Sequence, residues 1–432
     1  MGGLIRDTEI ENTIAAYHAP IIDAAGLDPA ALHYYVLSTR ELNAFVAGGQ
    51  NIFITTGLLM RAEHAGQVIG VLAHETGHIV GGHIAQLEGV VREAGLQAII
   101  AQIIGVGVSV LTRNPNAAGV LGSAGVSTIG RALLHYNRGQ EQAADQAGLR
   151  FLDAAHMSAR GMLEFLQILS RQEFLTSARQ DPYLLTHPLT QDRIDFVQRH
   201  VEESRWSNVP VSPQLNDRHN RMRAKLEGFL NPPQTTLLKY KDTDTSLYAR
   251  YARAVALYRL PDIAGAVKTI DGLLAEHPND PYFLELKGQM LFENGKIAES
   301  IPPTEAAVRI LPNAPLLREA LAHALIEMND PEKDAQALTH LRAGLQIDPQ
   351  MPEAWRLAAT AYGRRGDMAM ASLSLAESNL LTGHREEARA QARRAQKGLK
   401  EGSPGWLRAE DILSASQKPD DAEREQERGR RR

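Results

Sequence analysis

The segment AHETGHIVGGH, from Ala73 to His83, places three histidines and one glutamate within eleven residues. His74 and His78 are four residues apart, so on a helix their imidazoles share one face and can reach a single tetrahedral zinc ion. Glu75 can then act as the general base toward the attacking water. The apolar stretch AGQVIGVLA before this motif predicts a buried helix. Because two histidines and a carboxylate on such a helix are costly without a metal, the pattern predicts a hydrolytic zinc site rather than a chance match.

His83 lies nine residues after His74, about 180° around a continuous helix. The longer pattern H-E-x-x-H-x-x-G-x-x-H does not fit, because its third histidine would fall on Ile84. Two glycines, Gly81 and Gly82, weaken the helix, and Gly82 could end it. We therefore expect His83 to have a packing or surface role.

A third ligand is needed, because a hydrolytic zinc takes three protein ligands and keeps one position open. The stretch NRGQEQAAD places Glu141, 63 residues after His78, on a predicted helix. Asp145 follows at i+4, so it faces the same way and could orient a ligand imidazole. We predict Glu141 as the third ligand; the alternative is a solvated helix carboxylate. An oxyanion donor is also required, and Arg193 and His135 are the candidates.

Several elements must position these side chains. Residues 7–27 read as a helix, and LHYYVLS reads as a strand. The stretch NAFVAGGQNIFITTGLL reads as a hairpin whose turn lies at Gly48 and Gly49. A sheet edge beside a metal-bearing helix can bind an extended peptide as an added strand, although a purely structural hairpin fits equally well. The candidate substrate-binding residues are therefore Asn43, Ala44, Phe45 and Val46.

Residues 88–135 contain eighteen consecutive uncharged residues, AGLQAIIAQIIGVGVSVL. That length is at the lower edge of a membrane span, which needs about 17–25 residues. Glutamines, a serine and glycines dilute its apolar character. We expect a lid or a helical insertion that contacts the membrane peripherally, rather than a span.

The C-terminal half repeats. Pro278, Pro312 and Pro349 occur at spacings of 34 and 37 residues in HPNDP, LPNAP and DPQMP. A helix–turn–helix period of 34 residues is typical of tetratricopeptide repeats, and an unrelated helical bundle is the weaker alternative. The longer spacing implies a three-residue insertion near 313–315. Such a stack presents a concave surface to protein partners.

Composition sets the remaining limits. A chain of 432 residues should hold two or three domains. It has no cysteine, and its net charge of −5 gives no argument for nucleic acid. The N-terminus has neither a basic nor an apolar signal region, so the protein is cytosolic or a signal was removed. We expect an α+β fold, mainly α: a zincin-type metalloprotease domain (1–205) with a small β-sheet, a linker with a short basic helix (206–246), a tetratricopeptide-repeat solenoid (247–414) and a disordered tail (415–432).

VLAHETGHIVGGH and NRGQEQAAD, with LNAFVAGGQNIFITTGLL before them, resemble the gluzincin peptidases related to the CaaX prenyl protease and to HtpX. With the repeats added, residues 4–413 resemble the soluble periplasmic branch of that family, the BepA-like proteins. The resemblance implies one zinc held by His74, His78 and Glu141, with Glu75 as the base. It also implies a periplasmic endopeptidase that acts on misfolded or stalled outer-membrane proteins, with the β-barrel assembly machinery as a partner of the repeats.

His187 stands in LLTHPLTQDR, on a loop before a helix that Thr190 should cap. For an arbitrary histidine, a surface position is the default interpretation. The resemblance extends through His187 and Arg193, however, and implies that this segment lies near the active site. Imidazole suits the fourth zinc position, so we predict that His187 can occupy it and hold the enzyme inactive. The rival function is a repeat-scaffold chaperone or adaptor with a gated, rarely active metal site.

Overall fold

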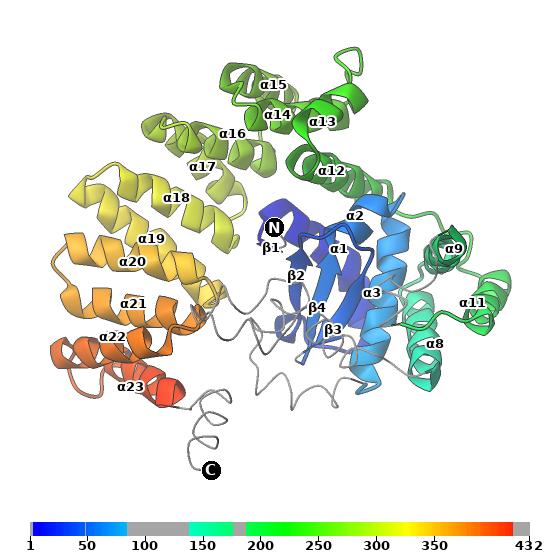
Figure 1. The fold of residues 1–432 in the computed structure, drawn as a ribbon, viewed down its shortest axis with the longest axis horizontal. Helices are drawn as coiled ribbons and strands as arrows, with labels where there is room; N and C mark the ends of the chain where they lie inside the picture. Colours follow the sequence, from blue (N-terminus) through cyan, green and yellow to red (C-terminus); the bar gives the residue numbers. More distant parts are fainter. Residues whose placement is uncertain (1–2, 48, 84–137, 176–186, 418–432) are drawn as a thin grey trace, which may run out of the picture. The chain divides into compact units, whose positions relative to one another are not determined.

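The computed structural model describes residues 3–47, 49–83, 138–175 and 187–417. Contacts divide the chain into two compact units, Met1–Leu230 and Asn231–Arg432 (Figure 1). The predicted insertion at 88–135, its candidate His135, Gly48 and residues 418–432 of the predicted tail lie outside the described residues. Within the described part, no helix has the length and apolarity that a membrane crossing requires.

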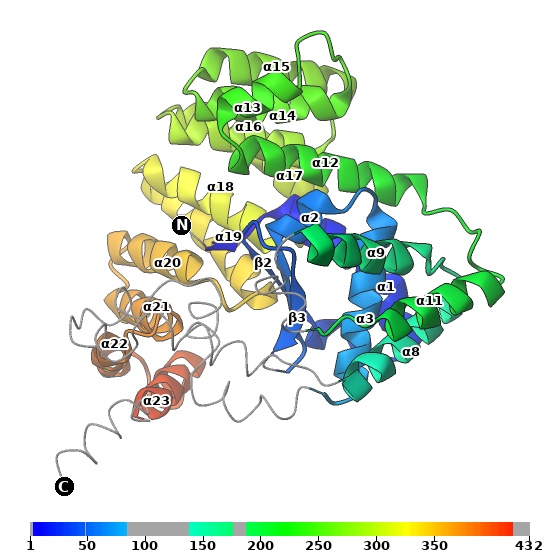
Figure 2. The same ribbon diagram turned by 45° about the vertical axis from the view of Figure 1, so that its right-hand side comes forward.

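The first unit contains a four-stranded sheet formed by β1 (Leu4–Ile5), β2 (His33–Leu37), β3 (Ala44–Ala47) and β4 (Asn51–Thr55). The strand order is β1-β2-β4-β3, with β2 and β4 parallel and the other pairs antiparallel. The expected hairpin is β3–β4, in which Phe45 is opposite Phe53. As a result, β3 forms one edge of the sheet (Figure 2).

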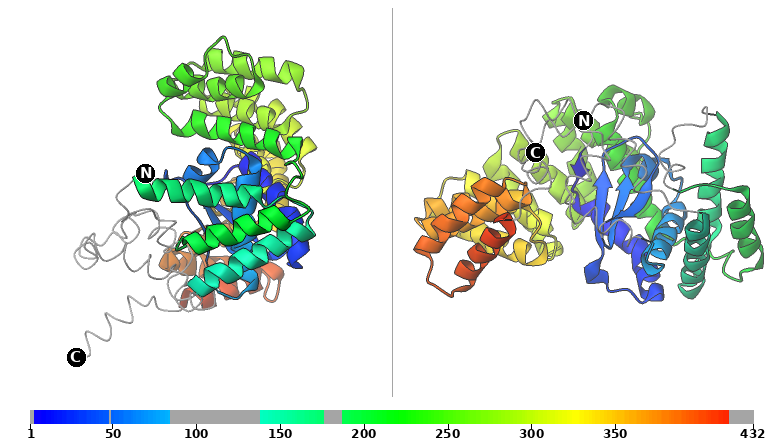
Figure 3. Two further views of the ribbon diagram at one scale, coloured as in Figure 1. Left: turned by 90° about the vertical axis from the view of Figure 1, so that its right-hand side faces the viewer. Right: turned by 60° about the horizontal axis from the view of Figure 1, so that its bottom comes forward.

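Helices pack on one face of this sheet and against one another. They are α1 (Thr8–Ala25), α2 (Thr56–Arg61), α3 (Ala65–Val80), α8 (Arg138–Ala154), α9 (Arg160–Leu175), α11 (Gln191–Glu203) and α12 (Pro213–Leu230), with a short 3-10 turn, η1 (Pro29–Ala31). The α3 helix carries the H-E-x-x-H motif and lies between the sheet and α8 (Figures 1 and 3). Its residues are buried almost throughout, so it forms the centre of the unit's hydrophobic core.

The first unit extends beyond residue 205, where the sequence analysis placed its boundary. Helix α12, expected to be a solvated basic helix in a linker, packs against α1 instead. The imidazole Nδ1 of His219 lies 3.2 Å from the hydroxyl of Tyr17, and the ammonium of Lys225 lies 2.6 Å from Asp7. Three of its charged or titratable side chains, His219, Lys225 and Glu227, are buried. Long-range packing of this kind leaves no periodic signal in a short basic stretch.

The second unit begins with α13 (Pro233–Lys239) and continues as antiparallel helix pairs. These are α14 (Leu247–Arg259) with α15 (Ile263–Glu276), α16 (Pro281–Glu293) with α17 (Ile297–Ile310), α18 (Pro315–Glu327) with α19 (Pro331–Ile347), α20 (Pro352–Arg364) with α21 (Met368–Leu381), and α22 (Arg385–Gly398) with α23 (Pro404–Gln417). The second proline of each predicted repeat motif begins a helix, as its fixed φ favours. Helical repeats are therefore confirmed.

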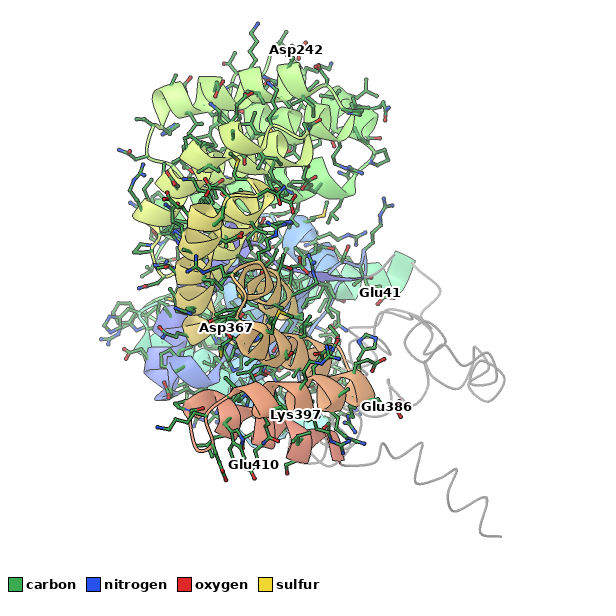
Figure 4. All side chains as sticks on the ribbon, turned by 90° about the vertical axis from the view of Figure 1, so that its left-hand side faces the viewer. Glu41, Asp242, Asp367, Glu386, Lys397 and Glu410 are labelled. Carbon is green, nitrogen blue, oxygen red and sulfur yellow. The ribbon has the colours of Figure 1, made fainter. Side chains whose placement is uncertain are left out.

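The extra three residues of the third repeat lie elsewhere than expected. First helices of successive pairs begin at residues 247, 281, 315 and 352, so the longer interval follows the start of α18. Helix α19 has 17 residues, whereas α17 has 14, and the extra length is therefore inside α19 rather than near 313–315. At the outside of the repeats, Asp367, Glu386, Lys397 and Glu410 are exposed (Figure 4). Three alanines of α22, Ala388, Ala392 and Ala395, pack inward.

Candidate metal centre

Four buried side chains converge in the first unit: His74 and His78 from α3, Glu141 from α8, and His187 from the segment before α11. One nitrogen or oxygen atom of each lies within 4.8 Å of all the others. The Nε2 atoms of His74 and His78 are 3.1 Å apart. Oε1 of Glu141 lies 3.3 Å from His78 Nε2, and Nδ1 of His187 lies 3.4 Å from His74 Nε2. Three imidazoles and one carboxylate make a donor set that suits zinc.

Close contact between α3 and α8 brings the first three residues together. A side chain at Gly77 would collide with the backbone of Ala144, 2.4 Å from its carbonyl oxygen. A side chain at Gly148 would lie 3.0 Å from the backbone of Ala73. Because both helices present glycine where their backbones meet, Glu141 can reach the imidazoles of α3 directly.

The outer nitrogen of His74 contacts a carboxylate that is itself fixed. His74 Nδ1 lies 2.8 Å from Asp145, and Arg193 donates two hydrogen bonds to Asp145, at 2.6 and 2.9 Å. Burial raises the pKa of Asp145, but the Arg193 guanidinium and the His74 imidazole outweigh it, so the pKa lies below its ordinary value. Asp145 is therefore a carboxylate held against the ring of His74.

Arg193 uses its donors on protein groups. Besides Asp145, its Nη1 lies 2.5 Å from Glu141 Oε2 and donates to the carbonyl of Pro188 at 3.0 Å. The guanidinium is buried beside the cluster and bridges two carboxylates. This geometry differs from the oxyanion donor that we predicted, because the donors already have acceptors. We therefore assign Arg193 an orienting role.

The charges of the cluster call for a cation. Burial lowers the pKa of His74, but Asp145 and Glu141 together raise it, to about 10. Burial raises the pKa of Glu141, yet the surrounding imidazoles hold it far below its usual range. Burial, in contrast, lowers the pKa of His78 well below normal. Arg193 balances one of the two carboxylates. The second positive charge is a proton on His74 in the metal-free chain, and a zinc ion would take its place while His78 stays neutral.

Glu75 gives an independent indication of a bound group. It is fully buried, and neither of its carboxylate oxygens has a hydrogen-bond partner among the described residues. Burial raises the pKa of Glu75, while His187 and His74 lower it less strongly. His187 Nε2 lies 3.6 Å from Glu75 Oε1, too far for a hydrogen bond. A buried carboxylate without a hydrogen bond is costly, so the residues present fit a metal and the water that accompanies it. Glu75 and the four converging residues therefore form one site.

His187 connects the cluster to the edge of the sheet. Its side chain is completely buried, so the default interpretation as a surface histidine does not describe it. Its Nε2 lies 3.1 Å from the carbonyl of Ala44 on β3, and its Nδ1 lies 3.1 Å from Glu141. A carbonyl can only accept, so Nε2 carries a proton. The ionised Glu141 also only accepts, so Nδ1 would present a lone pair to the cluster only with a metal ion between them.

The predicted substrate-binding residues lie at this edge. The amide of Thr55 donates to the carbonyl of Asn43, so Asn43 faces β4. Alternation along an antiparallel pair then turns the backbone polar groups of Ala44 and Val46 toward the outer edge. Phe45 packs on Phe53 with ring centroids 4.9 Å apart. The contact of His187 with the Ala44 carbonyl therefore joins the candidate ligands to the outer edge of β3.

One contact was missed from the sequence. Helix α3 ends at Val80, so the 180° separation expected for a continuous helix does not apply to His83. Its Nδ1 lies 3.0 Å from Nδ1 of His78. The pair Gly81 and Gly82 was the signal that could have revealed this return of the chain.

An H-E-x-x-H helix whose histidines meet a carboxylate from a second helix, in a small α+β domain, defines a zinc metallopeptidase. Residues 7–201 match the profile of Peptidase family M48. The beta-barrel assembly-enhancing protease of Yersinia pestis is 27% identical over 361 residues, covering 81% of this chain and 72% of that protein. The protein of the same name from Escherichia coli K12 is 25% identical over 415 residues, covering 90% and 83%.

Solved structures similar to this chain include the tetratricopeptide-repeat protein YrrB, with 17% identity and a TM-score of 0.34, covering 41% of this chain and 91% of that one. Another is a thermophilic repeat protein of Thermus thermophilus, with 19% identity and a TM-score of 0.25, covering 42% and 98%. With the family match, the predictions of a zinc metallopeptidase and of a resemblance to BepA-like proteins are confirmed.

Proposed function

We propose that this chain is a zinc endopeptidase that degrades, or assists the assembly of, misfolded or stalled outer-membrane β-barrel proteins in the periplasm. The observation that carries the proposal is the convergence of His74, His78 and Glu141 beside the carboxylate of Glu75, which has no hydrogen-bond partner among the described residues. The names of the Yersinia and Escherichia relatives support the substrate class. One zinc per chain follows from the single cluster of this kind found among the described residues.

Each residue of the site has a separate task. His74, His78 and Glu141 hold the zinc, which supplies Lewis-acid polarisation of the scissile carbonyl. Glu75 takes a proton from the attacking water and passes it to the leaving amine, and its raised pKa makes it a stronger base. Arg193 holds Asp145 against His74 and thereby fixes the ring of that ligand.

His187 serves as the gate in this proposal. Its Nδ1 takes the fourth ligand position while its Nε2 binds the carbonyl of Ala44. An extended substrate that adds to β3 needs that carbonyl, so the resting loop blocks both the metal and the strand edge. Opening of the loop therefore precedes binding. Partner proteins, including the β-barrel assembly machinery, bind to the repeats, and peripheral membrane contact is assigned to 88–135.

A chaperone or adaptor with a rarely open metal site is the second candidate. The complete burial of His187 favours it, because a resting site that is closed can spend most of its time without substrate. The two functions differ in one measurable respect. Neutralising Glu75 should abolish peptidase activity, whereas it should leave a chaperone or adaptor activity unchanged.

The test combines metal content with cleavage. Elemental analysis should give about one zinc per chain in the parent and in Glu75→Gln, and His74→Ala should lose most of it. Cleavage of a purified, unfolded β-barrel protein should fall about 100-fold or more in Glu75→Gln and after chelation. Glu63→Gln, which changes an exposed glutamate before α3, is the matched control and should behave like the parent. Full zinc retention in His74→Ala, or cleavage by Glu75→Gln at the parent rate, would refute the assignment.

A further inference from the structure

The two histidines of α3 are held at their outer nitrogens by different groups. His74 Nδ1 lies 2.8 Å from the carboxylate of Asp145. His78 Nδ1 instead lies 3.0 Å from Nδ1 of His83, with the two rings steeply inclined at 72° and their centroids 5.1 Å apart. His83 itself is not one of the four converging residues. Its imidazole therefore faces a proposed ligand without facing the metal.

The end of α3 explains how His83 reaches this place. Gly82 adopts a left-handed conformation with φ of 64°, and its N–H donates to the carbonyl of Ile79 at 3.1 Å. The N–H of His83 donates to the carbonyl of His78, also at 3.1 Å. These two bonds define a Schellman motif, in which the side chains of His78 and His83 are brought into contact. That contact is usually between two apolar side chains, and here both are imidazoles.

Gly81 provides the space for the returning ring. A Cβ atom at this position would lie 2.6 Å from Nε2 of His83 and 2.7 Å from its Cε1. Real Cβ contacts are essentially never that short, so any side chain at Gly81 would push the imidazole away. The two glycines therefore have separate tasks: Gly82 turns the chain, and Gly81 leaves room for the ring.

The direction of the hydrogen bond follows from the proposed ligand role of His78. A neutral imidazole that presents the Nε2 lone pair to a metal carries its proton on Nδ1. Nδ1 of His78 is therefore the donor, and the lone pair on Nδ1 of His83 is the acceptor. We propose that His83 is a positioning residue that fixes the tautomer and the ring orientation of His78, and so raises the affinity for zinc. This inference depends on the proposed zinc site.

Zinc affinity of the full chain, measured by competition with a chromophoric chelator, tests the role. Loss of such an acceptor typically weakens metal binding about 10- to 100-fold, and we expect that for His83→Ala and His83→Leu. In His83→Asn, the side-chain oxygen stands where Nδ1 stood, so affinity should return to within a few-fold of the parent. His33→Ala removes an exposed histidine of the same unit and should change nothing.

A double-mutant cycle with Gly81 separates positioning from general stability. Gly81→Ala keeps His83 but displaces its ring, so it should weaken zinc binding about as much as His83→Ala. Added to His83→Ala, it should have little further effect, because the contact is already lost. In the zinc-bound parent labelled with ¹⁵N-histidine, the Nδ1 proton of His78 should show a coupling across the hydrogen bond to Nδ1 of His83. That coupling should disappear in both single variants.

Three outcomes would overturn the proposal: parent-like affinity in His83→Ala, equal losses in His83→Asn and His83→Leu, or fully additive losses in the double variant. Circular dichroism of the metal-free chains checks that each variant folds. If His83→Ala does not fold, Gly81→Ala and His83→Asn still decide the question. A parent chain that binds no zinc would refute the proposed metal site instead, so the two failures are distinguishable.

Discussion

Every proposed histidine ligand depends on a second group that fixes its protonation state. Asp145 contacts His74, His83 contacts His78, and the carbonyl of Ala44 contacts His187. Only the third of these partners belongs to an element that a substrate strand would also use. His74 and His78 are therefore held permanently, whereas the contact of His187 competes with substrate.

That competition leads to a prediction for His187→Ala. We expect zinc to be retained through the other three ligands. If about 90–99% of the parent chains have His187 in the closed position, cleavage should be about 10- to 100-fold faster in the variant. The reason is that the fraction of chains able to bind substrate rises to one. Initial rates on an unfolded β-barrel protein, together with self-cleavage of the chain, measure the effect. Unchanged or slower cleavage with zinc retained would rule out the gate.

At the scale of elements, α3 is tied to α1 and β2 by a buried chain of hydrogen bonds. The hydroxyl of Tyr34 lies 2.9 Å from His18 Nδ1, and His18 Nε2 lies 2.6 Å from the hydroxyl of Thr76. Thr76 in turn donates to the carbonyl of Leu72 at 2.7 Å. His18 must therefore donate from Nε2. The Tyr34 hydroxyl can donate to Nδ1, which completes the contacts of a neutral imidazole. Burial lowers its pKa to about 3.

This neutral histidine should make the stability of the first unit depend on pH. In the unfolded chain the pKa of His18 is about 6.5, so between about pH 6.5 and 3 only the unfolded state takes up the proton. Stability then falls as the pH falls, by about 1.4 kcal/mol for each unit. Chemical unfolding of His18→Gln at pH 7, 6 and 5 should show a shallower decrease than the parent. The exposed His33→Gln is the control, and parallel curves for parent and His18→Gln would contradict the prediction.

At the scale of the whole molecule, the peptidase unit ends at Leu230. Its last helix, α12, covers the outside of α1 with buried charges. Arg221 Nε lies 3.0 Å from Glu9, and Lys225 lies 2.6 Å from Asp7. No site residue lies on α12, which contacts α3 at its first residue, where the Ala65 N–H donates to Asn216. We therefore expect this helix to act on the site through the stability of the fold.

Two fragments test this division. A fragment ending at Leu230 should fold and bind zinc, whereas one ending at Arg205 should melt at a lower temperature, because it leaves the carboxylates of Asp7 and Glu9 without these cations. Both should lose the partner complexes of the full chain, because the repeat surface is gone. Thermal melting and a pull-down from outer-membrane extracts measure the two effects. Equal melting temperatures, or the same partners held by the 1–230 fragment, would contradict the prediction.

The sequence by itself determined whatever depends on short spacings. The i,i+4 histidines with Glu75 between them place the chemistry on one helix face, and the proline-marked repeats define the paired helices. The need for a third ligand and the i,i+4 pair of Glu141 and Asp145 pointed to Glu141, and the family resemblance added the segment of His187. Such patterns can be predicted because helical geometry converts a spacing directly into a direction.

Apart from Asp145, which its i+4 spacing from Glu141 indicated, only the tertiary structure decided which groups fix the ligands. Arg193 bridges Asp145 and Glu141 because α11 meets α8, and no spacing in the sequence specifies that contact. His83 returns to His78 because α3 stops at a left-handed glycine, whereas a continuous helix would have carried it to the opposite face. Helix α12 packs in the first unit through charged side chains that the sequence pattern predicts to be solvated. In each case the deciding contact joins two elements or follows the end of a helix. The periodicity of a sequence holds only within one element, so it cannot predict such contacts.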